Sequence, residues 1–229
     1  TSFQCAVPQR APGFRAISGT TGPIAPGRTS AQRADTGFAV DSAAPSPLSA
    51  SARLHTVMIQ EKIEKTALIT GATSGIGMAL AERLAASGSY RLILCGRRAE
   101  RLDGLRDRIG GDDVATLKFD VGDRSAVEGA LGSLPAPFWP VDVLVNNAGN
   151  AHGLAPIQGG DPEDWDRMIE SNLRGLLNVS RLVSASMVER RQGQIINVGS
   201  IAGKEAYPDG NVYCATKAAV DSLTQGMRM

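Results

Sequence analysis

Apolar residues follow two alternating patterns along the chain from Thr66 onward. Short apolar runs bounded by polar turn residues predict buried strands over 66–70, 91–95, 114–119, 141–147 and 194–199. Between these runs, apolar residues recur at the spacing of one helix face over 75–88, 99–109, 124–132, 162–192 and from 212 onward. Strands that alternate with helices are typical of an α/β fold, so we predict a doubly wound parallel sheet covered by helices.

The long helix after residue 160 has the clearest start signal in the chain. Asp161 can cap it, Pro162 fits the first helical position, and the following acidic residues complement the positive end of the helix dipole. Gly193 is expected to end this helix. Its apolar side is expected to comprise Trp165, Met168, Ile169, Leu176, Val179, Leu182, Val183 and Met187.

Residues 1–57 differ in composition from the rest of the 229-residue chain. They are rich in Ala, Ser, Thr, Pro and Gly, with five Arg, two Asp and neither Lys nor Glu, and show no apolar periodicity. We therefore interpret 1–57 as a disordered extension or linker and 58–229 as the folded domain. An Arg- and Ser-rich, acid-poor segment is also compatible with an organellar transit peptide. The linker interpretation is preferred and favours a cytoplasmic protein.

The overall composition narrows the possible partners. A formal net charge of +1 gives no electrostatic reason to expect nucleic acid or a membrane surface as a partner. No apolar run reaches the roughly 18 residues that a membrane-spanning helix needs. The three cysteines, Cys5, Cys95 and Cys214, lack the spacing of metal ligands or of a disulfide framework, so no metal is expected and a reducing compartment is favoured.

A glycine-rich segment joins the first predicted strand to the first helix. Glycines at such a junction permit a tight turn and let backbone amides approach a pyrophosphate at the positive end of the helix. A turn without a ligand is the alternative, but the position at the first strand–helix junction favours a dinucleotide site in a Rossmann-like sheet. The residues assigned to cofactor binding are Gly71, Ala72, Thr73, Ser74, Gly75, Ile76 and Gly77.

The second predicted strand is followed by Arg97 and Arg98, where an acidic residue would grip the ribose 2′-hydroxyl of NAD. Two guanidinium groups can instead bind a 2′-phosphate through forked, charge-assisted hydrogen bonds, which makes NADP the preferred cofactor. The alternative is a solvated helix start in which these arginines pair with Glu100 or Asp103.

Polar residues also follow the third and fourth predicted strands. Asp120, beside Val121, could accept a hydrogen bond from an adenine amino group, although a turn or capping role is equally compatible. Asn147, Ala148 and Gly149 belong to a short turn that is expected to face the same crevice, because ligands of parallel sheets bind beyond the carboxyl ends of the strands. A simple Asx-Gly turn is the alternative.

The last predicted helix carries Tyr213 and Lys217, four residues apart and therefore on one face, thirteen residues after Ser200. An ammonium held beside a phenol favours its ionised form, which suits a group that exchanges protons. Taken alone, such a pair is more often a surface feature of a helix.

Taken in order, TGATSGIG, NNAG, Ser200 and Tyr213-x-x-x-Lys217 resemble the short-chain dehydrogenase/reductase family over about residues 62–229. The segments CGRRAERL, PEDWDRMI and GNVYCATKA are similar to those of its NADP-dependent 3-hydroxy acid dehydrogenases. The resemblance implies that Tyr213 is the acid/base, Lys217 assists it and contacts the nicotinamide ribose, and Ser200 binds the substrate oxygen. It implies that Asn172 holds a water in a proton relay.

The implied function is an NADP-dependent oxidoreductase that interconverts a small 3-hydroxy acid, or a similar secondary alcohol, and its carbonyl. A 3-oxoacyl-carrier-protein or broad carbonyl reductase is the nearby alternative, and a nucleotide-sensing or interaction protein is the non-enzymatic one. Family members usually form homodimers or homotetramers. They also continue past this helix with further strands and a substrate lid. We therefore expect a truncated chain that lacks strands six and seven, is weakly active alone and is prone to associate.

Overall fold

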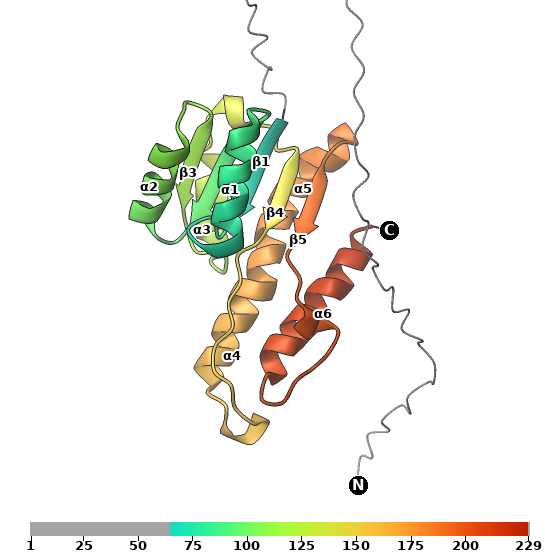
Figure 1. Cartoon of the computed structure of the whole chain (residues 1–229). Helices are drawn as coiled ribbons and strands as arrows, with labels where there is room; N and C mark the ends of the chain where they lie inside the picture. Colours follow the sequence, from blue (N-terminus) through green and yellow to red (C-terminus); the bar gives the residue numbers. More distant parts are fainter. Residues whose placement is uncertain (1–64, 229) are drawn as a thin grey trace, which may run out of the picture. The chain divides into compact units, whose positions relative to one another are not determined.

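The computed structural model describes residues 65–228 as one parallel five-stranded sheet with helices on both faces (Figure 1). The interpretation of residues 1–57 falls outside the described residues. The strands lie in the order β3-β2-β1-β4-β5, and every neighbouring pair is parallel. They span β1 (Lys65–Thr70), β2 (Tyr90–Gly96), β3 (Val114–Lys118), β4 (Val143–Asn146) and β5 (Gln194–Asn197).

The helices follow the strands as the apolar spacing predicts. They are α1 (Gly75–Ser87), α2 (Ala99–Ile109), α3 (Arg124–Gly132), α4 (Pro162–Ile169), α5 (Gly175–Arg190) and α6 (Asn211–Gly226). Short 3₁₀ turns lie at η1 (Ala136–Phe138), η2 (Ile157–Gly159) and η4 (Ile201–Gly203). The predicted doubly wound α/β fold is confirmed, and the Rossmann-like order follows from strands that run outward from β1 in both directions.

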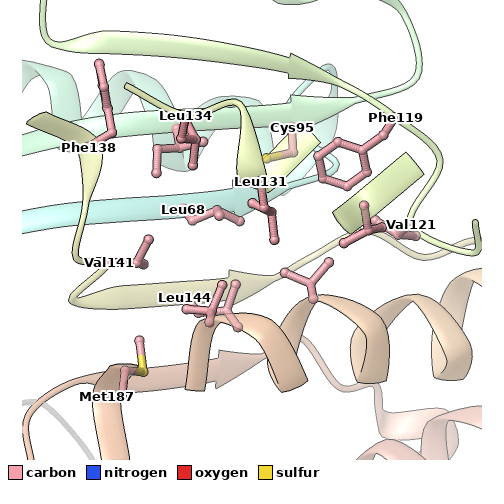
Figure 2. Packing of buried hydrophobic residues seen from close by; sticks show 14 residues of the cluster. Leu68, Cys95, Phe119, Val121, Leu131, Leu134, Phe138, Val141, Leu144 and Met187 are labelled. Carbon is pink, nitrogen blue, oxygen red and sulfur yellow. The ribbon is translucent and has the colours of Figure 1, made fainter. Parts of the chain in front are cut away.

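Each sheet face has its own apolar core, because successive side chains of a strand point to opposite faces. One core joins Leu68, Ile93 and Leu144 to side chains of α3 and α5, such as Leu131 and Met187 (Figure 2). The other core joins the neighbouring strand residues to α1 and α2, and comprises Ala67, Ile69, Ala72, Ala81, Leu92, Leu94, Leu102, Leu105 and Val145. Burial on both faces explains why the strands are nearly continuous apolar runs.

The predicted long helix is broken into two by a π-helical turn, η3 (Glu170–Arg174). Its start agrees with the sequence, since Asp161 Oδ1 accepts a hydrogen bond from Glu163 N at 2.9 Å. Its end lies earlier than the expected Gly193, because Arg191 adopts the left-handed conformation and donates its backbone N–H to Val188 O. Ile169, placed on the apolar side by its spacing, is 41% exposed just before the π turn.

Hydrogen bonds between polar side chains fasten the helices of one face to the sheet. Asn146 Nδ2 donates to Ser180 Oγ on α5 at 2.8 Å and to Asn197 Oδ1 on β5 at 2.9 Å. Asn197 Nδ2 in turn donates to Thr224 Oγ1 on α6 at 2.9 Å. This chain of bonds fixes α6 beside β5 and so sets the position of the side chains that α6 carries.

No helix within residues 65–228 has the length and apolar character needed to cross a membrane.

Candidate active site

A cavity of about 850 Å³ lies at the carboxyl ends of the strands, where a parallel sheet is expected to bind its ligand. Every strand-to-helix connection of the described fold contributes to its wall. The lining residues that the sequence predicted are Gly71, Thr73, Ser74, Gly75, Ile76, Arg97, Arg98, Asp120, Val121, Asn147, Ala148, Gly149, Ser200, Tyr213 and Lys217. The structure thus brings together residues that are up to 146 positions apart, from Gly71 to Lys217.

The glycine-rich turn forms one end of this cavity. Gly71 has a φ of +66°, and a Cβ atom there would lie 2.9 Å from Ala148 Cα. Gly75, with a φ of +55°, opens helix α1, whose first turn carries no acidic residue. Free backbone amides and the positive end of a helix dipole therefore face the cavity. A helix start without an acidic side chain, opened by a glycine, fits a pyrophosphate-bearing cofactor.

Two predicted cofactor residues support the turn from behind and do not line the cavity. Ala72 is fully buried, and its backbone N–H donates to Cys95 O at 3.0 Å. Gly77 packs so closely on the turn that a Cβ atom would lie 2.5 Å from Gly71 O. Both positions pack behind the turn, and the direct cofactor contact that the motif suggested for them stays a prediction.

Thr70 joins the glycine-rich turn to the NNAG turn. Its Oγ1 donates to Val145 O at 3.3 Å and accepts hydrogen bonds from Asn147 N and Ala148 N, both at 3.0 Å. The Asn147 side chain donates to Thr70 O at 2.9 Å and to Gly71 O at 3.2 Å. The NNAG turn is therefore a cross-link between two loops of the cavity wall, which a simple Asx-Gly turn would not provide.

The two arginines after β2 lie at the rim of the cavity. Arg98 Nη2 donates to Thr73 Oγ1 at 2.7 Å and lies 3.4 Å from Ser74 Oγ, so its guanidinium is held over the glycine-rich turn. Arg97 Nη1 lies 3.4 Å from Asp120 Oδ2, and its side chain is 70% exposed. The alternative from the sequence is a solvated helix start in which these arginines pair with Glu100 or Asp103. Among residues 65–228 neither arginine forms such an ion pair, so this pairing is wrong. Asp120 also accepts a hydrogen bond from Gly122 N at 3.0 Å, as its alternative turn role requires.

Tyr213 and Lys217 project from α6 into the opposite end of the same cavity. The Lys217 ammonium lies 5.9 Å from the centre of the Tyr213 ring, and it donates a hydrogen bond to Val198 O at 2.9 Å. Only 8% of Lys217 is exposed, and burial lowers the pKa of its ammonium. Ser200 lies three residues after the end of β5 and caps a short turn by accepting a hydrogen bond from Ala202 N at 3.2 Å. A phenol, a hydroxyl and a buried cation thus meet at one wall.

Asn172 lies behind this group, in the π turn, and does not line the cavity. It is 2% exposed, so the alternative of a helix-surface residue is wrong. Its Oδ1 accepts from Asn150 N at 2.8 Å, while its Nδ2 donates to Asn150 O at 2.9 Å and to Thr216 Oγ1 at 3.0 Å. Thr216 Oγ1 donates to Tyr213 O at 2.8 Å. Asn172 therefore clamps the loop after NNAG to the helix that carries Tyr213.

Three residues of this framework escaped the sequence reasoning. Thr70 is the first residue of the glycine-rich motif and could have been identified from it, whereas no motif in the sequence marks Asn150 or Thr216.

His152 and Tyr213 share a second, smaller cavity of about 20 Å³. In the described part of the chain no group of three His, Cys, Asp or Glu side chains is placed to hold a metal ion.

A parallel sheet with a glycine-rich first turn and a Tyr/Lys pair at its carboxyl edge defines an α/β protein of the Rossmann-like class. Residues 65–229 match the family model described as short chain dehydrogenase. The chain therefore belongs to the short-chain dehydrogenase family, as the resemblance of its motifs implied.

Two relatives illustrate the level of similarity. The NADP-dependent 3-hydroxy acid dehydrogenase YdfG of Salmonella typhi is 47% identical over 161 residues, which are 70% of this chain. The serine 3-dehydrogenase of Rhizobium radiobacter is 43% identical over 163 residues, which are 71% of this chain. The chain spans 64% of the length of each of these relatives.

The fold is also similar to solved structures. The crystal structure of serine dehydrogenase from Escherichia coli matches with a TM-score of 0.69 and 45% identity, over 71% of this chain and 74% of that one. The closed form of serine dehydrogenase complexed with NADP⁺ matches with the same score and identity, over 71% of this chain and 65% of that one.

Proposed function

We propose that this protein is an NADP-dependent oxidoreductase that interconverts a small 3-hydroxy acid, or a similar secondary alcohol, and its carbonyl compound. The observation that carries the proposal is one continuous cavity, with two arginines at one end and Tyr213, Lys217 and Ser200 at the other. The arginines fit a 2′-phosphate, and the far end fits a carbonyl that gains or loses a proton. The names of the two relatives described above point to the same chemistry.

The residues of the first end suit NADP. The amides at the start of α1 would face the pyrophosphate, because no acidic side chain opposes an anion there. Arg98, already held over Thr73, and Arg97, which is largely exposed, would bind the 2′-phosphate. Asp120 and Val121 would border the adenine, and Gly149, whose Cβ position is 3.6 Å from Lys217 Nζ, would border the nicotinamide ribose.

The residues of the second end suit proton transfer. When bound, NADP supplies the hydride donor or acceptor. Tyr213 would give its hydroxyl proton to the carbonyl oxygen during reduction and take it back during alcohol oxidation. Ser200 would donate a hydrogen bond to the same oxygen and so hold it within reach of the tyrosine. The Lys217 ammonium would stabilise the phenolate that forms when Tyr213 gives up its proton.

Asn172 has a supporting role in this proposal. Its side chain is fully engaged with the backbone of Asn150 and with Thr216, so it fixes the loop and helix on either side of Lys217. The family resemblance implies a relay water. The rigid loop and helix around Lys217 and the Lys217 ammonium itself would therefore hold this water in place.

The proposal extends to assembly and location. Exposed apolar side chains on α4 and α5, namely Ile169, Leu177 and Val188, support association into a homo-oligomer. Cys95 and Cys214 are buried free thiols, which suit the reducing environment of the cytoplasm. In domain terms, residues 58–229 would form the NADP-binding catalytic part of the chain.

The test is a spectrophotometric assay of NADPH formation by the whole chain with serine, 3-hydroxypropionate and 3-hydroxybutyrate. We expect turnover of at least one of these and a loss of about 10²- to 10⁴-fold in Tyr213→Phe, with NADPH binding retained. Tyr207→Phe is the matched control, because Tyr207 precedes the same helix but does not line the cavity. Full turnover by Tyr213→Phe would contradict the assignment.

Two other results would redirect the proposal. A clear preference for a 3-oxoacyl thioester over the hydroxy acids would favour the carrier-protein reductase alternative. NADPH binding without turnover of any of these compounds would favour a nucleotide-binding protein that is not an enzyme.

A further inference from the structure

The loop that follows β3 rests on the helix that carries Asn172. Loop residues Asp120 and Val121 line the large cavity, whereas the backbone of Val121 and Gly122 turns toward α5. Gly175, the first residue of α5, lies so close that a Cβ atom there would be 2.4 Å from Val121 Cγ2. A Cβ atom on Gly122 would be 3.3 Å from Glu170 Cβ. The loop and the helix are therefore in direct contact from Glu170 to Asn178.

Asn178 provides the polar part of this contact. Its side-chain Nδ2 donates to Val121 O at 2.9 Å and to Gly122 O at 3.3 Å. Asn178 is 7% exposed, so a water molecule cannot easily replace its amide. The nearby Asp120 carboxylate accepts from Gly122 N, and Asp120 O accepts from Asp123 N at 3.1 Å. The loop is therefore held from both sides, by its own turn and by Asn178.

The π turn explains how neighbouring residues of one helix contact both α6 and the loop after β3. Gly175 donates its backbone N–H to Glu170 O, which inserts one residue into the turn and rotates the following residues around the helix axis. Asn172 therefore faces Asn150 and α6, whereas Gly175 and Asn178 face the loop after β3. π turns of this kind are frequent at functional sites.

We infer that Asn178 is a positioning residue for the adenosine half of the cofactor, a role that rests on the proposed function. Its amide holds two carbonyl groups of the loop away from the cavity, so that Asp120 and Val121 present their side chains to it. Without that donor the two carbonyls are left buried and unpaired, and the loop is expected to move to find other partners. A shift of the loop would displace the adenine-facing wall while leaving Tyr213 and Lys217 on α6 unchanged.

The experiment compares Asn178→Leu with Ser180→Ala in the whole chain. Leucine has the branched outline of asparagine but cannot donate a hydrogen bond. Ser180 is the matched control, because it is also buried on α5 and hydrogen-bonded, but to Asn146 on the sheet and not to the loop. Adenosine 2′,5′-bisphosphate is the probe, since it carries only the adenosine end of NADP, and its binding is measured by isothermal titration calorimetry.

We expect Asn178→Leu to weaken adenosine bisphosphate binding about five- to tenfold, which is the size of effect that losing one or two hydrogen bonds produces. Ser180→Ala is expected to change this affinity by less than about twofold. Hydrogen exchange gives a readout without any ligand, since the amides of Gly122 and Asp123 should exchange faster only in the Asn178 variant. Asn178→Ser, which is smaller and polar, serves the same comparison if the leucine variant does not fold.

Three outcomes would overturn the inference. Equal losses of affinity in the Asn178 and Ser180 variants would show that Asn178 acts only through general stability. Unchanged affinity in a folded Asn178 variant would show that the loop needs no support from α5. Absence of binding to the unsubstituted chain would instead refute the proposed cofactor, and with it this role.

Discussion

Lys217 has the most unusual environment of any charged side chain in the site. Lys217 is only 8% exposed, its ammonium has no carboxylate partner among the described residues, and it donates one hydrogen bond, to a backbone carbonyl. Burying a cation without a counter-ion costs stability, and this cost explains why the pKa of Lys217 is lowered. The proposed role of the charge, which is to stabilise the Tyr213 phenolate, offers a reason for this cost.

This environment makes the stability of the protein depend on pH in a defined direction. Because burial lowers the folded-state pKa of Lys217, the folded chain binds fewer protons than the unfolded chain between the two pKa values. Stability from this residue therefore rises as the pH increases through that window, and the penalty is fully present below it. Lys217→Met removes the penalty, so the variant should have its greatest relative advantage below the window and lose that advantage as the pH rises through it. Urea unfolding of both proteins over this range checks the trend, and a difference that stays constant with pH would contradict it.

The two arginines at the cavity rim allow a test of cofactor selectivity. Replacing Arg97 or Arg98 with alanine should weaken NADPH binding about 10- to 100-fold, because each substitution removes charge-assisted hydrogen bonds to a phosphate. NADH lacks that phosphate and should lose far less affinity. Arg106→Ala is a suitable control, since Arg106 is an α2 arginine paired with Asp103 and outside the cavity lining. Fluorescence titration with both cofactors measures the effect, and equal weakening of NADPH and NADH would argue against a 2′-phosphate site.

At the scale of elements, the junction of β1 and β4 determines how the cavity is closed. The Thr70 hydroxyl makes three hydrogen bonds that tie the two strand ends together. Thr70→Val keeps the shape of the side chain but leaves two amides and a carbonyl without this partner. We expect a loss of about 1–3 kcal/mol in the free energy of unfolding, together with weaker NADPH binding. Thr66→Val is the control, because the Thr66 hydroxyl on the same strand makes no side-chain hydrogen bond within residues 65–228. Comparable losses in both variants would mean that the junction has no special role.

The sequence predicts some features of these elements and of the cavity lining, and not others. The strands and helices follow from apolar spacing and end signals, and helices α2 and α3 begin and end at the residues that the pattern predicts. The π turn has no such signal, because its extra residue is set by contacts of Asn172 and Gly175 with distant loops. Motif spacing also places most of the cavity lining. It does not reveal that Ala72 and Gly77 pack behind the turn, or that the Asn147 amide faces a neighbouring loop, because those directions depend on the tertiary fold.

At the scale of the whole molecule, exposed apolar side chains on α4 and α5 suggest a surface between subunits. Ile169 and Leu177 are 41% and 46% exposed, so both present apolar area to the solvent. We expect the purified chain to elute as a dimer or larger species, and we expect Leu177→Glu to shift it toward the monomer, because a charge at a subunit contact must be desolvated. Size-exclusion chromatography with light scattering measures the mass. Arg181→Glu is the control, because it changes the charge of an exposed α5 residue without removing an apolar side chain. If Leu177→Glu left the mass unchanged, the contact between subunits would lie elsewhere.

Ligand binding offers the most direct way to separate the two halves of the cavity. A ligand that binds only the folded chain stabilises it by about 2.7 kcal/mol at a concentration one hundred times its dissociation constant. For a protein of this size that corresponds to a rise of roughly 5–10 °C in the melting temperature. NADPH should produce this rise in the unsubstituted chain and equally in Tyr213→Phe, since the phenol hydroxyl is needed for proton transfer and not for binding the phosphates. In a chain with both Arg97 and Arg98 replaced, NADPH should raise the melting temperature no more than NADH does. If Tyr213→Phe lost the rise and the arginine variant kept it, the cofactor would be bound in the opposite orientation to the one proposed, and the roles of the two ends of the cavity would have to be exchanged.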